Sequence, residues 1–147
     1  RMHLIKRYLG ISFLMIYFSL NLSAQVFLKT EAEIKAHADE VMRYMGNNQF
    51  DNAFEELDAS WPFKSEELGE LKNTTKSQFA EASVRFGKII GSDFIKEQKV
   101  GDYLLRRVYV LRFERHMLPF YIRYYRSQEG WLLSGVTWND QIDKLFE

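Results

Sequence analysis

The chain has 147 residues, of which 46% are hydrophobic and 16% are aromatic, and it contains no cysteine. This composition excludes a disordered chain and a disulfide-bonded scaffold, and the length fits one domain with a hydrophobic core. The 20 basic and 20 acidic side chains balance, but residues 25–147 alone carry 17 basic and 20 acidic ones. A net negative domain of this kind does not suggest a nucleic-acid-binding protein.

Residues 1–24 differ in character from the rest of the chain. Lys6 and Arg7 precede an apolar run, and Ala24 ends a short stretch of small residues. This layout is typical of a secretory signal peptide that is cleaved after Ala24. The alternative is an uncleaved membrane anchor, but the apolar run is short against the roughly 20 residues that a spanning helix needs. We therefore expect export to the periplasm or the extracellular space, no stable membrane span after cleavage, and a single domain over residues 25–147.

Three helices are predicted in the first half of this domain. The sequence Thr30-Glu31-Ala32-Glu33 fits a capping box, and an apolar stripe at three- and four-residue spacings predicts a helix over 31–45 that ends at Gly46. A shorter repeat of the same pattern predicts a helix over 51–58. Pro62 breaks it and places Trp61 in a loop. Ser65 is then a cap for a third helix that extends to about Phe86.

The apolar period changes from 3.6 to 2 after this third helix. Four strands are expected, at Asp93–Gln98, Tyr103–Glu114, Leu118–Arg126 and Trp131–Trp138. Short turns join the last three, and a final helical turn carries Ile142, Leu145 and Phe146. Helices followed by strands predict an α+β fold, in which three N-terminal helices pack on a curved antiparallel four-stranded meander.

The order of these elements resembles the nuclear-transport-factor-2-like superfamily. The features that carry the resemblance are Gly87-Lys88, Tyr109, the aromatic run Phe120–Tyr125 and Gly130-Trp131-Leu132-Leu133. They are similar to small exported bacterial members of unassigned function. The resemblance implies a pocket between the helices and the concave sheet, and dimerisation through the sheet. It implies no activity, because members of one fold perform unrelated functions. None of the family's catalytic motifs matches particular positions of this chain.

The pairing of the central strands divides their side chains between two faces. If His116-Met117 forms a two-residue turn, Phe113 faces Phe120 and Tyr109 faces Tyr124. One face is then strongly apolar and should be covered by the helices. The opposite face mixes arginines with aromatic residues, a composition enriched at protein interfaces. Candidates for a sheet interface are Arg112, Tyr121, Arg123, Tyr125 and Trp138. The alternative is a solvated face whose aromatic rings pack against arginine stems.

Motifs for catalysis or for cofactors are not found in the sequence. Residues 25–147 contain only two histidines, His37 and His116, and no cysteine, so we expect no metal site and no cofactor. Residues that could line a ligand pocket are Trp61, Tyr103, Arg107, Tyr109 and Tyr124. No residue is assigned a catalytic role.

These patterns indicate a class of function only. We expect an exported, non-catalytic domain that binds a small apolar or aromatic ligand, or a protein partner, and that self-associates as a homodimer through its sheet. The alternative is a small pocket enzyme of the isomerase, dehydratase or hydrolase type. That alternative requires two titratable side chains that converge in one pocket with a shifted pKa.

Overall fold

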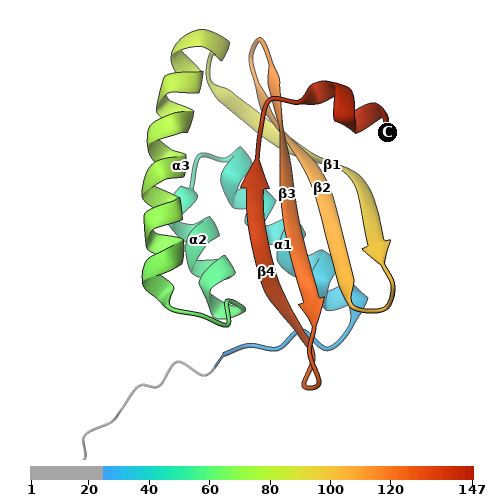
Figure 1. Ribbon diagram of the computed structural model, residues 1–147. Helices are drawn as coiled ribbons and strands as arrows, with labels where there is room; N and C mark the ends of the chain where they lie inside the picture. The colour runs from blue at the N-terminus through green and yellow to red at the C-terminus, as the bar shows by residue number, and fades with distance from the viewer. Residues whose placement is uncertain (1–24) are drawn as a thin grey trace, which may run out of the picture.

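The computed structural model describes residues 25–147, and the predicted signal peptide lies outside these residues. The described chain folds as α+β, with three helices that precede a four-stranded antiparallel sheet in the order β1-β2-β3-β4 (Figure 1). The elements are α1 (Glu31–Gly46), α2 (Phe50–Ala59), α3 (Ser65–Phe86), β1 (Ile89–Val100), β2 (Leu104–Phe113), β3 (Met117–Arg126), β4 (Trp131–Trp138) and a 3-10 helix, η1 (Ile142–Phe146). The predicted α+β class and the meander are confirmed.

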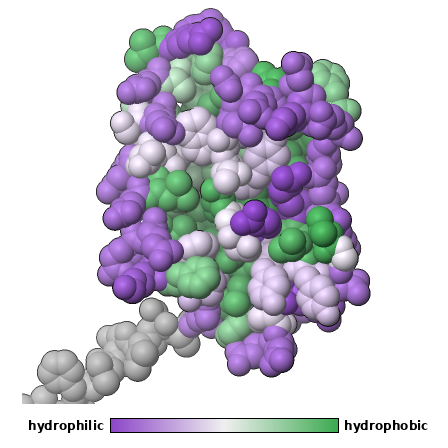
Figure 2. Space-filling view, in the orientation of Figure 1, coloured by the Kyte–Doolittle hydropathy of each residue, from purple (hydrophilic) through white to green (hydrophobic). Residues whose placement is uncertain are grey.

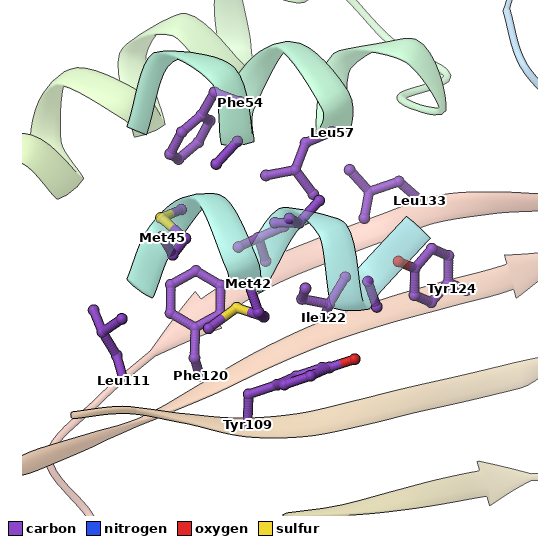
Figure 3. Close-up of a cluster of buried hydrophobic side chains, with 14 of the residues drawn as sticks. Met42, Met45, Phe54, Leu57, Tyr109, Leu111, Phe120, Ile122, Tyr124 and Leu133 are labelled. Atoms are coloured by element: carbon purple, nitrogen blue, oxygen red, sulfur yellow. The ribbon is translucent and has the colours of Figure 1, made fainter. Parts of the chain in front are cut away.

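The helices lie on one face of the sheet, and we call this face of the sheet the inner face. Helix α1 packs on β1 and β2, and α2 covers α1 from the outside, so that α1 lies between α2 and the sheet (Figure 3). Helix α3 runs alongside β4 (Figure 1). Phe79 of α3 contacts Trp138 of β4, with 4.8 Å between ring centroids. The opposite, outer face of the sheet carries η1 at one end. Among residues 25–147, no helix is long and apolar enough to cross a membrane.

The start of α1 is capped by Thr30 as predicted, but Glu33 reaches the amide of Lys29 instead of that of Thr30, so only half of the capping box forms. The Thr30 hydroxyl accepts a hydrogen bond from the Glu33 amide at 3.1 Å, and the Glu33 carboxylate accepts one from the Lys29 amide. The end of α1 differs from the prediction. Gly46 is the last helical residue, and the residue with a left-handed backbone is Asn48, with φ 60°. Gly46 is required for another reason, because a Cβ there would lie 2.8 Å from the Ser92 backbone nitrogen of β1.

The predicted register of the β2–β3 hairpin is wrong by an even number of residues. Tyr109 faces Phe120 and Leu105 faces Tyr124, because the turn occupies residues 114–116 and Arg112 already pairs with Met117. The backbone amides of Glu114 and Arg115 donate hydrogen bonds to carbonyl groups at the end of α3 and just after it, which removes these residues from the ladder. An even shift keeps the parity of each strand. The apolar face therefore still points to the helices, as Figure 3 shows for Tyr109, Phe120 and Tyr124.

Three of the predicted strands have other bounds, and the smallest difference is in β3, which begins one residue early, at Met117. Strand β1 is twice as long as predicted, because register shifts at Ile89/Gly91 and Phe94/Lys96 interrupt the alternation that identifies a strand. Strand β2 begins and ends one residue inside its predicted bounds. A further bulge lies in β4, where Tyr124 pairs with Leu133 but the preceding Arg123 pairs with Gly135. The residues of β4 that follow this bulge change faces relative to the prediction.

Candidate functional site

A buried arginine organises a polar cluster at the β1 edge of the interior. Arg107 is 3% exposed, and its Nη1 donates to Glu97 Oε2 at 2.7 Å and its Nη2 to Asp39 Oδ1 at 3.3 Å. Its Nε donates to the Tyr109 hydroxyl at 2.8 Å, and that hydroxyl donates to Asp39 Oδ1 at 2.6 Å. The ring of Phe94 covers the guanidinium at 4.1 Å. We call Asp39, Glu97, Arg107 and Tyr109 the interior network.

The electrostatics of the interior network favour a structural role. Burial acts to raise the pKa of Asp39, but hydrogen bonds from Lys35 and Tyr109 and the charge of Arg107 lower it below its usual value. Burial, together with the hydrogen bond to Asp39, raises the pKa of Tyr109. The carboxylate is thus ionised and the phenol protonated at neutral pH, and each already has a partner. Neither group is prepared to exchange a proton with a substrate.

A second buried polar contact joins α1, α2 and β3. The Nε2 of His37 lies 3.0 Å from the Glu56 carbonyl oxygen, and its Nδ1 lies 2.7 Å from the Tyr124 hydroxyl. A carbonyl oxygen can only accept, so Nε2 carries the proton and Nδ1 accepts from Tyr124. Burial lowers the pKa of His37 and raises that of Tyr124, so both groups are neutral near pH 7.

The five residues predicted to line a pocket lie in three places. Arg107, Tyr109 and Tyr124 come together in the interior, where they are 3%, 2% and 0% exposed. Neighbouring protein atoms cover them. Tyr103 is 64% exposed before β2, and Trp61 lines a hollow at the end of α2. The interior thus brings titratable groups together, and the partly exposed carboxylates of Asp39 and Glu97 connect this cluster with solvent.

The outer face of the sheet carries the most distinctive charge arrangement. Arg106 and Arg123 face each other directly across β2 and β3, and both are exposed. Like charges in directly opposed positions destabilise a sheet. Within residues 25–147, no carboxylate lies within 4.0 Å of the basic groups of Lys96, Arg106, Arg123 or Lys144. We call these four residues the basic patch.

Two hollows lie beside the basic patch. One, of about 350 Å³, is lined by Lys96, Arg106 and Lys144 together with Tyr121 and Thr137. The other, of about 310 Å³, is lined by Arg106 and Arg123 together with Leu104 and Val100. Arg106 borders both, with its guanidinium 5.2 Å from the Tyr121 ring centroid. Figure 2 shows this face of the molecule, where strongly hydrophilic side chains lie beside hydrophobic ones.

Four of the five residues predicted for a sheet interface lie on the outer face. Strand parity puts Arg112, Tyr121, Arg123 and Tyr125 there. The placement of Trp138 on this face is wrong. The bulge in β4 turns Trp138 to the inner face, where it packs on Phe79 of α3.

Several residues of these clusters were not singled out from the sequence. Asp39 and Glu97 look like exposed charges of a helix and a poorly alternating strand, and only the fold brings them to Arg107. Arg106 could have been found, because its parity in β2 matches that of Arg112 and so places it on the same face. Lys96 and Lys144 reach the patch through the β1 bulge and the position of η1. No group of three or more His, Asp or Glu side chains among residues 25–147 is placed to hold a metal ion.

Comparison of the chain with protein-family models, with curated proteins and with solved structures finds no match in any of the three.

Proposed function

We propose that this chain is a non-catalytic binding domain that uses the outer face of its sheet to hold an acidic peptide segment of a partner protein. The observation that carries the proposal is the direct pairing of Arg106 with Arg123, both without a carboxylate partner. Arg106 donates to Gln98 of β1 and Arg123 donates to Ser134 of β4, so within residues 25–147 both guanidinium groups have neutral partners only. An anion that contacts both groups would relieve their repulsion. Charge-assisted hydrogen bonds from arginine to carboxylate are among the stronger polar contacts.

The surroundings of the basic patch favour an extended and partly apolar segment. Tyr125 is 47% exposed, and Tyr121 and Leu104 are partly exposed on the same face. Aromatic and aliphatic side chains next to cations match a peptide that alternates acidic with apolar residues. A ligand inside the helix–sheet interior, the other expectation from the sequence, is less well supported because the interior tyrosines are covered.

The experiment compares an acidic with a basic peptide. A fluorescent peptide of alternating Glu and Tyr should bind with an affinity that falls as salt is added, and a Lys and Tyr peptide should not bind. Arg106→Gln should weaken binding about tenfold, which corresponds to about 1.4 kcal/mol. Arg126→Gln is the matched control, because Arg126 is also an exposed arginine of β3 but lies outside both hollows. Equal losses in the two variants would contradict the proposal, and binding of a sulfated oligosaccharide alone would reassign the surface to a glycan.

The proposed setting is outside the cytoplasm, and it rests on the layout of residues 1–24. Lys6 and Arg7, the apolar run after them and the small residues before Gln25 support a cleaved signal peptide. N-terminal sequencing of the exported protein should begin at Gln25. The resemblance to the nuclear-transport-factor-2-like superfamily remains a proposal for its ancestry, supported by the order of helices and strands.

A further inference from the structure

A third hollow, lined by acidic instead of basic residues, lies in the helical layer where α2 ends and α3 begins. It has a volume of about 510 Å³, and its lining includes Glu55, Asp58, Trp61, Pro62 and Phe63. Small-molecule sites commonly measure about 300–1,000 Å³. The hollow is separate from the basic patch, because the two share no lining residue.

The aromatic wall of this hollow follows from local sequence. Pro62 keeps Trp61 out of helical geometry, so α2 ends and the loop before α3 presents two rings. Trp61 and Phe63 stand edge to face, with 5.2 Å between ring centroids and 76° between planes. Phe63 is 66% exposed, so its ring is available for a contact at the hollow.

Two carboxylates and a helix end contribute negative charge at this hollow, and cleavage after Ala24 would add one positive charge, the α-amino group of Gln25, to its lining. Within residues 25–147, no basic group lies within 4.0 Å of the Glu55 or Asp58 carboxylate, and the Asp58 carboxylate accepts a hydrogen bond from the Ser65 hydroxyl at 3.0 Å. The C-terminal end of α2 has no basic residue in its last turn, so its partial negative charge is not offset by a side chain. A neighbouring hollow of about 310 Å³ is also lined by Glu55, Asp58 and Ser65, so these two carboxylates face a hollow on each side.

We propose that this hollow binds a small organic cation, an alkylated ammonium group, between the Trp61–Phe63 rings and the carboxylates of Glu55 and Asp58. Aromatic faces attract cations through their quadrupole, most strongly for tryptophan, and the carboxylates supply the charge. A hydrated inorganic cation would gain little from the rings. A neutral apolar ligand would gain nothing from the carboxylates. The combination therefore selects a cation with an apolar shell, either as a free molecule or as the methylated side chain of a peptide.

The test follows the indole N–H signals of the full chain by NMR, assigned with a Trp61→Phe variant, while choline is added. The Trp61 signal should shift with millimolar affinity. The neutral isostere 3,3-dimethyl-1-butanol and potassium chloride should cause at least tenfold weaker effects. A trimethyllysine peptide beside choline distinguishes the two sources of the cation. Equal shifts from choline and its neutral isostere, or no shift of Trp61 at 50 mM choline, would overturn the proposal.

Matched variants separate the rings from the charges. Phe63→Ala should weaken choline binding about fivefold, whereas Phe146→Ala, at an even more exposed ring on η1, should leave it unchanged. Glu55→Gln should weaken it severalfold, whereas Glu66→Gln in the first turn of α3 should not, because Glu66 does not line the hollow. If both phenylalanine variants behaved alike, the aromatic wall would have no role. Phe63, Glu55 and Glu66 line neither hollow of the basic patch, so acidic-peptide binding should persist when these three residues are changed.

Discussion

At the scale of single residues, His37 is a buried neutral group that makes stability depend on pH. Burial lowers its pKa in the folded state, whereas in the unfolded chain it titrates near 6.5. Between these two values the unfolded chain binds more protons, so the free energy of unfolding falls as the pH drops below about 6.5. The fall is at most about 1.4 kcal/mol per pH unit for one group.

Urea denaturation of the wild type and of His37→Gln between pH 5 and pH 8 checks this expectation. Glutamine keeps one donor and one acceptor near Glu56 and Tyr124 but does not titrate. The variant should be less stable at pH 8, and its stability should vary less between pH 7 and pH 5. Parallel pH curves would show that His37 is not the group that couples folding to protons in this range. Asp39 does not contribute to the pH dependence in this range, because its pKa is lowered and its effect on the free energy of unfolding falls at more acidic pH.

Arg107 allows a structural role of the interior network to be separated from a catalytic one. Its side chain is 4% exposed, whereas those of Asp39 and Glu97 are 38% and 27% exposed. Arg107→Met should destabilise the fold by about 2 kcal/mol, because it removes the charge-assisted hydrogen bonds of a buried arginine to two partly exposed carboxylates. Adding Asp39→Leu should recover part of that loss, as measured by urea denaturation. Full stability of Arg107→Met would point to a functional role for the arginine.

At the scale of elements, the contact of α1 with β1 is set by a glycine. The Gly46 backbone approaches Gly91 and Ser92 so closely that an added Cβ meets backbone atoms at 2.8 and 2.9 Å, and the Ser92 hydroxyl donates to the Met42 carbonyl at 2.7 Å. Gly46→Ala should therefore lower the free energy of unfolding by about 2 kcal/mol, because α1 or β1 must move. Gly69 lies inside α3 with nothing within 4 Å of its added Cβ.

Gly69 provides the matched control for this prediction. Gly69→Ala should raise the free energy of unfolding by about 0.5–1 kcal/mol, because alanine favours a helix and meets no neighbour. Thermal unfolding of the two single variants would then change in opposite directions. A stabilising effect of Gly46→Ala would contradict the close approach of α1 to β1.

The elements also show which parts of this fold can be predicted from sequence. Helix positions follow from caps and apolar spacing, and the inner face of the sheet follows from strand parity, which an even register error leaves intact. The face of the sheet on which Trp138 lies and the length of β1 could not be predicted, because each depends on a bulge in the strand. The interior network could not be predicted either, because it depends on contacts between residues far apart in the sequence. Arg107 looked like a pocket residue until Asp39, 68 positions earlier, supplied its partner.

At the scale of the whole molecule, charge is separated even though the total is close to zero. Residues 31–70, which include α1, α2 and the start of α3, carry 11 acidic and 3 basic side chains, whereas residues 71–147 carry 9 acidic and 13 basic ones. The basic patch and the hollow at Glu55 and Asp58 are local expressions of this separation. A homodimer through the outer face, which the sequence suggested, would bring two copies of Arg106 and Arg123 into one interface, and among residues 25–147 Glu147 is the one acidic residue that lines the two hollows there. Like-charge contacts across an interface oppose association.

The wild type should therefore sediment as a monomer at micromolar concentration in 150 mM salt. Replacing both arginines by glutamine (Arg106→Gln with Arg123→Gln) removes the repulsion while the apolar groups beside them remain, among them Tyr125 at 47% exposure. This double variant should self-associate more strongly than the wild type. The control pair Lys88→Gln with Arg126→Gln removes the same charge at exposed positions outside the basic patch and should stay monomeric. A stable wild-type dimer that dissociates when Arg106 and Arg123 are neutralised would contradict the argument, because the arginines would then be holding two copies together instead of keeping the face free for an acidic partner.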